Sequence, residues 1–373
     1  MLKFNENGKF RIMQIADIQD TANVSPDTIN LISRAIESEK PDLVIFSGDQ
    51  IYGLAPSFIG NSYEKVKNSI NTILKPVVDA GIAFTYVYGN HDDNRFALSK
   101  EEQFKIYKDN PLCLAFNADD NIEGYCNHNL LVKDRNGKDC MNIYLIDSLS
   151  MDIGGDSPPV SESQIEWYRK TRDKLYADNK KYIPSIVFQH IPVPEVYNLL
   201  IKNDKKTAGY VRGYDQYAGY YTIDKDNCRN YEKSFIGESP AVPFKNGGEF
   251  DAFKECGDVF SVYYGHDHAN SFVGRYQGID LGYTQGVGFN TYGPAYKRGV
   301  RVFEFDEKNP AEYETYTVTA EDFPDFEVSD KLKFTFMNNA PTSAKQVIPK
   351  IEIGLAVIAV TSVSIAIYKK FKK

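Results

Sequence analysis

Cysteine and histidine are both scarce in this chain of 373 residues, which contains five of each. The cysteines form no Cys-x-x-Cys pair and their number is odd, so we expect reduced structural thiols rather than a disulfide framework or a thiolate metal site. No Gly-x-Ser-x-Gly stretch occurs, which excludes the serine elbow of α/β-hydrolases. Internal repeats are absent as well. These absences direct attention to the few histidines.

Basic residues are also in short supply. Lysine and arginine number 43 against 51 acidic residues, for a formal net charge of −8. Residues 341–373 hold six lysines and one glutamate, so residues 1–340 carry a net charge of −13. Such an acidic body repels nucleic acid unless bound cations reverse the field locally, and we expect no nucleic-acid binding. The length allows two domains or one large α/β unit.

Long apolar runs are missing except at the C-terminal end. The opening "MLKFNENGKF" has no apolar core of a secretory signal. Residues 351–368, "IEIGLAVIAVTSVSIAIY", carry one charge, Glu352, and "KKFKK" follows them. At ~1.5 Å per residue they span about 27 Å, close to the ~30 Å hydrocarbon core of a bilayer. We predict a membrane-spanning helix, with a buried terminal helix as the alternative.

Two opposing signals leave open on which side of the membrane the body of the protein lies. The terminal lysines predict a cytoplasmic C-terminus and an external body. The missing leader predicts a cytoplasmic body, which we take as the expected location.

Apolar strands alternate with helices along the chain, which predicts an α/β fold. A helix is expected from Ser25 to Glu39, with Ser25 as N-cap and Pro26 in the first helical position. Asn136-Gly137 is typical of a tight hairpin. Residues 203–246 read as a loop rich in tyrosine and glycine. The expected strands are 10–16, 42–48, 82–89, 184–189, 258–265 and 299–306, and further helices are expected near 62–80 and 161–178.

Each of five apolar strands ends in a residue that can bind metal. The carboxyl ends of strands in an open α/β sheet border one crevice, so these residues are expected to meet. Carboxylate, amide oxygen and imidazole together suit a pair of borderline or hard cations. Four of the five histidines take part, whereas His128 borders a hairpin strand and is expected to be structural. The five stretches are Asp17, Gly48-Asp49, Gly89-Asn90-His91-Asp92, His190 and Gly265-His266-Asp267-His268.

In this order the motifs resemble those of the calcineurin-like metallophosphoesterases, and most of all the small purple-acid-phosphatase-like branch. The resemblance covers about residues 9–306. It implies a four-layer α/β/β/α sandwich, here followed by a C-terminal hydrophobic helix. The expected organisation is a catalytic domain at 1–336, a linker at 337–350, the transmembrane helix at 351–368 and a basic tail at 369–373. The motifs read Asp17-Ile18-Gln19, Gly48-Asp49-Gln50-Ile51-Tyr52, Gly89-Asn90-His91, Val187-Phe188-Gln189-His190 and Gly265-His266-Asp267-His268.

The resemblance also implies a ligand set for two metal ions, iron together with zinc, manganese or a second iron. The first metal would be held by Asp17, Asp49, Tyr52 and His268. The second would be held by Asn90, His190 and His266, with Asp49 bridging both.

Gln19 stands where the wider superfamily has a histidine, and in the purple acid phosphatase pattern a tyrosine at position 52 takes that coordination place. The alternative is that Tyr52 is a packed aromatic, and Gln19 is then a weak amide ligand, a residue behind the ligands or the mark of an emptier site.

The implied activity is hydrolysis of a phosphomonoester, in a phosphorylated small molecule or a phosphoprotein, by in-line attack of a metal-bound hydroxide on phosphorus. His91 would lie near the phosphate and stabilise it or protonate the leaving group. One alternative is a phosphodiesterase of the same superfamily, acting on a nucleotide or a lipid headgroup. Another is a membrane-tethered binding module without activity.

Three more residues, Arg95, Arg212 and Asp267, are candidates at the edge of this site. Asn90 and Arg212 are substrate-binding candidates together with Arg95. Arg212 lies in "GYVRGYDQYAGYY" (209–221), which is either an aromatic lid or ordinary loop packing. Asp267, between two predicted ligands, either orients a histidine or is a plain turn carboxylate.

Overall fold

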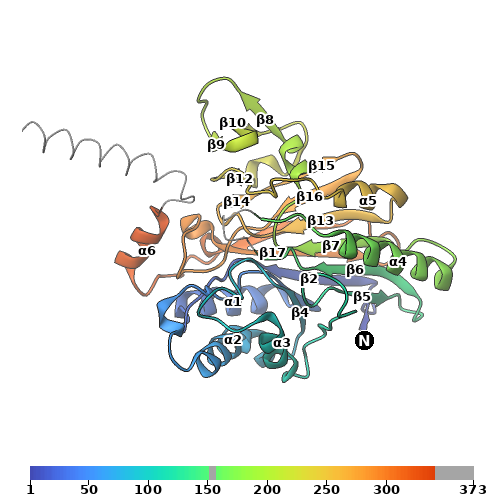
Figure 1. Cartoon of the computed structure of the whole chain (residues 1–373), viewed down its shortest axis with the longest axis horizontal. Coiled ribbons are helices and arrows are strands. Elements are labelled where there is room, and N and C mark those ends of the chain that lie inside the picture. Colours follow the sequence, from blue (N-terminus) through green and yellow to red (C-terminus); the bar gives the residue numbers. More distant parts are fainter. Residues whose placement is uncertain (151–156, 341–373) are drawn as a thin grey trace, which may run out of the picture.

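Two β-sheets lie face to face in the computed structural model, which describes residues 1–150 and 157–340 (Figure 1). The five-stranded sheet has the order β18-β17-β2-β3-β4, with β2, β3 and β4 parallel and β17 antiparallel to β2. Its strands are β2 (Lys9–Ile15), β3 (Leu43–Ser47), β4 (Ala83–Val87), β17 (Gly299–Asp306) and β18 (Glu314–Thr319).

The eight-stranded sheet has the order β1-β5-β6-β7-β13-β16-β15-β11. Its centre, from β6 to β16, is parallel, and antiparallel pairs flank that centre. The strands are β1 (Leu2–Lys3), β5 (His128–Lys133), β6 (Asp139–Ile146), β7 (Ser185–Gln189), β11 (Cys228–Arg229), β13 (Val259–Tyr264), β15 (Val273–Tyr276) and β16 (Ile279–Tyr283).

Helices cover both outer faces (Figure 1). The five-stranded sheet packs against α1 (Pro26–Glu39), α2 (Ser62–Asp79) and α3 (Lys100–Lys108), and the eight-stranded sheet packs against α4 (Glu162–Asn179) and α5 (Glu249–Cys256).

The alternation of side chains along a strand sends Met13 toward the helices and Ile12 into the core between the sheets, where it meets Phe188 and Phe303. The predicted four-layer α/β/β/α arrangement is confirmed.

Residues 203–246 contain more regular structure than expected. β8 (Leu200–Asn203), β10 (Gly219–Ile223) and β9 (Val211–Gly213) form a small antiparallel sheet that projects from the body, and β12 (Phe235–Ile236) pairs with β14 (Asn270–Ser271). Such short strands offer too few positions for a hydrophobic period to be visible. Short 3₁₀ turns are η1 (Pro56–Phe58), η2 (Pro194–Leu199), η3 (Asp215–Tyr217), η4 (Tyr231–Lys233), η5 (Ala295–Lys297) and η6 (Ala320–Asp322).

α3 was not among the expected helices, although its start carries a signal. Ser99 and Glu102 form a reciprocal capping box.

The C-terminal part of the described chain ends with α6 (Lys331–Asn338), which extends across the predicted domain boundary at 336. The predicted transmembrane helix at 351–368 lies outside the described residues. Within residues 1–150 and 157–340, no helix combines the length and the apolar character needed to span a bilayer.

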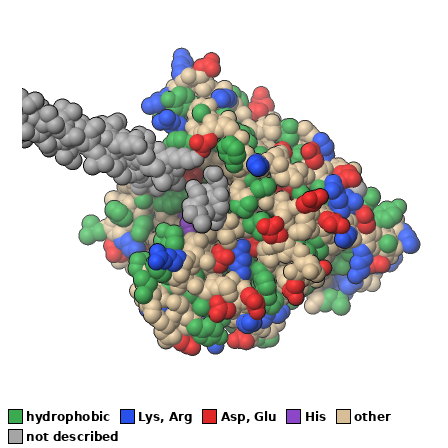
Figure 2. Space-filling model, in the orientation of Figure 1, with side chains coloured by type: hydrophobic (Ala, Val, Ile, Leu, Met, Phe, Trp, Pro, Cys, Tyr) green, Lys and Arg blue, Asp and Glu red, His purple; other side chains and the backbone are tan. Residues whose placement is uncertain are grey.

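Acidic and basic side chains are interspersed over the face seen in Figure 2. On this face the basic side chains do not form the continuous band that is typical of nucleic-acid-binding surfaces.

His128 is buried in the second sheet and held by two hydrogen bonds. Its Nδ1–H donates to the Cys126 carbonyl (2.6 Å), and its Nε2 accepts from the Thr85 hydroxyl (2.7 Å). Burial lowers the pKa of His128 to about 4. The neutral ring is therefore the form that the fold stabilises, as a structural role requires.

This burial predicts acid sensitivity. Because the folded-state pKa lies below the ordinary value of about 6.5, the contribution of His128 is fully present above pH 6.5 and is lost as the pH falls toward 4. Between pH 7 and pH 4.5 the free energy of unfolding of the wild type is expected to fall by on the order of 2–3 kcal/mol more than that of His128→Gln, which has no imidazole to protonate. Urea unfolding at the two pH values measures this difference. Parallel pH dependences of the wild type and His128→Gln would contradict the assignment.

Candidate metal centre

The predicted ligands converge where five parallel strands end. Asp17 follows β2, Asp49 follows β3, Asn90 follows β4 by way of Tyr88 and Gly89, His190 follows β7, and His266 follows β13. The first two loops hold each other, since the Asp17 N–H donates to the Gly48 carbonyl (3.2 Å) and the Gln19 N–H donates to the Asp49 carbonyl (2.6 Å). Asp17, Asp49 and His266 all have positive φ (50°, 53° and 70°), a backbone strain typical of functional sites.

One group of ligand atoms surrounds Asp17. The carboxylate oxygens of Asp17 and Asp49 and a ring nitrogen of His268 lie within 4.8 Å of one another, and all three residues are buried. The His268 Nε2 is 3.4 Å from Asp17 Oδ1. Its Nδ1–H donates to the Tyr292 carbonyl (3.0 Å), and the two rings stack with centroids 4.1 Å apart. This tautomer leaves Nε2 free to bind a cation.

A second group surrounds His190. The His190 Nε2 lies 3.2 Å from Asn90 Oδ1, 3.3 Å from His266 Nδ1 and 3.3 Å from Asp49 Oδ2. The other nitrogen, Nδ1–H, donates to the Ser47 carbonyl (3.0 Å), so Nε2 again points at the neighbouring ligand atoms. The Asn90 Nδ2, buried beside them, has no hydrogen-bond partner in the described structure. Asp49 belongs to both groups.

The buried carboxylates and imidazoles of this cluster shift one another's pKa values. Burial raises the pKa of Asp17 well above its usual range. Against the opposing effect of burial, the His190 charge lowers the pKa of Asp49. Burial opposes the charge on His190 too, but the Asp49 carboxylate raises its pKa to about 10. A proton on His190 thus compensates the carboxylates, and a metal ion coordinated by the same atoms supplies that positive charge instead. The donor set fits two cations.

Glycines allow this close approach. A Cβ at Gly48 would lie 2.4 Å from His190 Nδ1, one at Gly89 would lie 2.2 Å from Asp49 Oδ1, and one at Gly265 would lie 2.6 Å from Asp17 Oδ2. No side chain larger than hydrogen fits these positions without displacing a ligand.

Gln19 and Tyr52 lie at the edges of the cluster. The Gln19 Oε1 accepts a hydrogen bond from the Thr291 hydroxyl, and its Nε2 donates to Asp49 Oδ2 (3.4 Å). Its amide therefore orients the shared carboxylate. The Tyr52 ring meets the His91 ring edge to face, with centroids 5.3 Å apart.

His91 is anchored on both its backbone and its ring. Its N–H donates to Asp49 Oδ1 (2.8 Å), and its Nδ1–H donates to Asn94 Oδ1 (3.0 Å). This contact occupies Nδ1 and leaves Nε2 as the other ring nitrogen.

Three other predicted residues make contacts outside the two ligand groups. The Asp267 carboxylate accepts the Ala241 N–H (3.2 Å) and thus binds a neighbouring loop. Arg95 is exposed, with its guanidinium 5.4 Å from the centroid of Phe96. Arg212 is exposed on β9 of the projecting sheet, where it lies 5.4 Å from the ring of Tyr214.

Two supporting residues had no predicted role. Asp92 accepts the N–H groups of Gly89 (2.7 Å), Asp49 (3.0 Å) and Ile51 (3.0 Å), and so joins two of the loops. It belongs to the predicted stretch Gly89-Asn90-His91-Asp92, but no role was assigned to it there. Tyr292 lies in the glycine-rich stretch 284–293 that follows β16, a further strand end that the motif search passed over.

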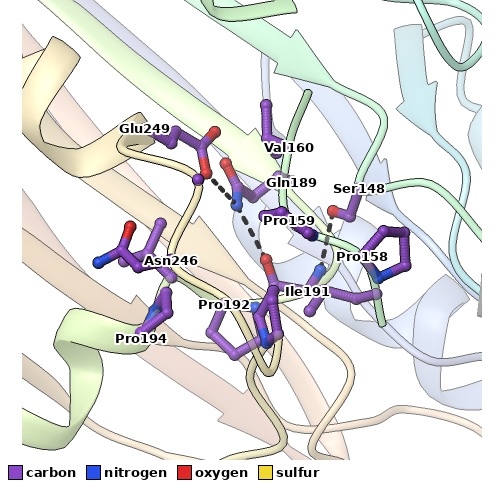
Figure 3. Close-up of a pocket in the computed structure, with 13 residues that line it drawn as sticks. Ser148, Pro158, Pro159, Val160, Gln189, Ile191, Pro192, Pro194, Asn246 and Glu249 are labelled. Carbon is purple, nitrogen blue, oxygen red and sulfur yellow. Dashed lines mark hydrogen bonds between the residues drawn. The ribbon is translucent and has the colours of Figure 1, made fainter. Parts of the chain in front are cut away.

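Side-chain hydrogen bonds fix the backbone on either side of His190, and Figure 3 draws those that involve Ser148, Gln189, Ile191 and Glu249. The Ser148 Oγ accepts the N–H groups of His190 and Ile191 (both 2.9 Å). Gln189 donates to the Ile191 carbonyl (2.9 Å) and to Glu249 (3.2 Å), beside a cavity of about 10 Å³ that prolines surround. Burial raises the pKa of Glu249 to about 8. These bonds fix the direction in which His190 leaves its strand.

Comparisons with known proteins agree with this geometry. Residues 10–270 match the family described as calcineurin-like phosphoesterase. "Probable inactive purple acid phosphatase 14" of Arabidopsis thaliana is 30% identical over 81% of this chain and 77% of its own length. "Probable inactive purple acid phosphatase 29" of the same plant is 29% identical over 82% and 79%. A dimetal phosphatase structure from Danio rerio shares the fold, with a TM-score of 0.50 and 13% identity over 83% of this chain and 99% of that one.

Proposed function

Because the chain belongs to the calcineurin-like phosphoesterase family, we propose that it is a dinuclear-metal phosphohydrolase that cleaves phosphate monoesters. The observation that supports this proposal is the pair of buried ligand groups that share Asp49. Asp17 and His268 would complete one metal position, and Asn90, His190 and His266 would complete the other. When bound, two cations supply positive charge to the phosphoryl oxygens and lower the pKa of water.

The chain's own contribution to the reaction falls mainly to His91. The leaving oxygen of a phosphate ester needs a proton. The Asn94 side chain holds the His91 ring through Nδ1, so Nε2 is the nitrogen that would deliver this proton. The Tyr52 ring restricts the same imidazole from its side.

Activity against two aryl phosphates tests the proposal. Protein shown to be metal-loaded, with manganese, zinc or iron supplied, is expected to hydrolyse a mono-aryl phosphate faster than a bis-aryl phosphate. Faster turnover of the bis-aryl compound would favour a phosphodiesterase. No turnover of either compound would favour a binding module without activity, and the two Arabidopsis relatives are themselves named as probable inactive phosphatases.

For the first metal position we propose iron with Tyr52 as a ligand. Tyrosinate bound to ferric iron absorbs visible light, so the iron-loaded wild type is expected to be coloured and Tyr52→Phe to lose the band. Metal analysis of both proteins controls for occupancy. An iron-loaded but colourless wild type would leave Tyr52 as a residue that only packs on His91.

A further inference from the structure

A second pocket lies at the edge of the sandwich, lined by none of the metal-centre residues. It has a volume of about 310 Å³, within the range of small-molecule sites. Its walls come from the segment 229–234, from β14 and β15, and from β17 and β18. The lining residues used below are Arg229, Glu232, Lys233, Ser271, Arg301 and Thr317. We call it the Arg301 pocket.

Arg301 is a buried cation whose hydrogen-bond partners within residues 1–150 and 157–340 are uncharged. The residue as a whole is only 4% exposed. In the described part of the chain it donates to Ser271 Oγ (2.9 Å), the Tyr283 carbonyl (3.0 Å) and Thr315 Oγ1 (3.3 Å). Its Nε has no hydrogen-bond partner there. A buried charge normally has a counter-ion, because desolvation costs several kcal/mol.

Asp280, a buried carboxylate in β16, is already shared by other groups. Asp280 is bound by Arg229 (2.5 Å), by Arg275 (2.6 Å) and by the Tyr313 hydroxyl (3.0 Å). Its charge is therefore shared by two other arginines, and the hydrogen bonds of Arg301 within the described residues go to uncharged groups.

The remaining lining also favours an anion. Lys233 is exposed at the pocket, and among the described residues that line it the only carboxylate is that of Glu232, which is also exposed. Three cationic side chains thus line a pocket in a chain whose net charge is −8. Ser271 and Thr317 add hydroxyl donors. Cations together with hydroxyl donors suit the several oxygens of a phosphate group.

We propose that the Arg301 pocket binds a small phosphorylated molecule, with its phosphate group directed toward Arg301 and Lys233. The volume exceeds the needs of the phosphate alone and accommodates a body of about the size of a sugar. Binding here involves no metal and no bond cleavage, so the pocket is independent of the proposed phosphohydrolase activity.

Calorimetry on the full chain freed of metal by a chelator tests the pocket apart from the metal centre. Ribose 5-phosphate is the probe, and inorganic phosphate and ribose are compared with it. We expect one ribose 5-phosphate per chain and no binding of ribose. Arg301→Met is expected to weaken binding at least about tenfold, and Lys233→Met about two- to fivefold. Lys254→Met, an exposed lysine on α5, is the control and should bind as the wild type does.

Two results would overturn the proposal. One is absence of ribose 5-phosphate binding to the metal-free wild type. The other is unchanged affinity in both Arg301→Met and Lys233→Met, which would leave Arg301 as a clamp between the strands. If Arg301→Met fails to fold by circular dichroism, Lys233→Met combined with Thr317→Val decides, because neither residue lies in the core. Failure of the phosphatase assay would leave this result untouched.

Discussion

Asp49→Asn is expected to lower kcat/KM for a phosphate monoester by about a thousandfold or more. Asp49 is 1% exposed and belongs to both ligand groups, with Oδ2 3.3 Å from His190 Nε2. Its Oδ1 also accepts the His91 N–H (2.8 Å). An amide keeps the shape but loses the negative charge, and one of its two ends presents hydrogens instead of lone pairs. The single substitution therefore weakens both metal positions and the placement of His91.

Metal analysis separates this explanation from simple misfolding. Asp49→Asn is expected to keep at most one metal ion per chain while its far-ultraviolet circular dichroism stays that of the wild type. Asp258→Asn is the matched control, because Asp258 is also buried but binds the Tyr168 hydroxyl (2.6 Å) beneath α4. The control should keep its metal and its activity. An Asp49→Asn protein with two metal ions and more than about a tenth of wild-type activity would remove Asp49 from the centre of the mechanism.

The convergence of the candidate ligands was predictable because most of them directly follow an apolar strand. Strand ends are visible as a break from apolar to polar residues, and parallel strands bring their ends to one edge. Asp17 and His190 are 173 positions apart, yet both follow strands whose type the sequence indicates. The alternation of strand and helix predicts an α/β fold, whereas the four layers were expected only from the resemblance to the calcineurin-like metallophosphoesterases.

The supporting contacts were less predictable, because many of them use the backbone. The partners of the His190 and His268 Nδ1 atoms are the carbonyls of Ser47 and Tyr292, and any residue type supplies a carbonyl. Asp267 shows a second limit. Its position between two histidines in the sequence does not tell where its side chain points. In the structure its carboxylate accepts the Ala241 N–H.

The Arg301 pocket had no sequence signal. Arg301 is one polar residue in the alternating strand "GVRVFEFD", where a polar side chain is expected to face solvent. The structure places it between the sheets because residues 301, 303 and 305 share one face of β17, and Phe303 and Phe305 on that face belong to the inter-sheet core.

Gly48→Ala is expected to reduce activity by about a hundredfold or more, although the substitution adds only a methyl group. Gly48 has φ +98°, and its Cβ would lie 2.4 Å from His190 Nδ1 and 2.5 Å from the adjoining ring carbon. The ring cannot retreat without losing its hydrogen bond to the Ser47 carbonyl (3.0 Å) and withdrawing Nε2 from Asn90 and Asp49. The metal position that contains His190 is therefore expected to empty.

Gly278→Ala isolates the steric part of this effect. Gly278 has a similar φ of +91°, but no heavy atom lies within 4 Å of its added Cβ. Both variants incur the backbone cost of an L-residue at positive φ, about 1–2 kcal/mol, whereas only Gly48→Ala collides with a ligand. Urea unfolding is therefore expected to show a larger loss of stability for Gly48→Ala, with metal content and activity reduced in that variant alone. Equal losses of stability with intact activity in both would mean that the His190 ring has room to move, and that the close contact at Gly48 does not define the metal position.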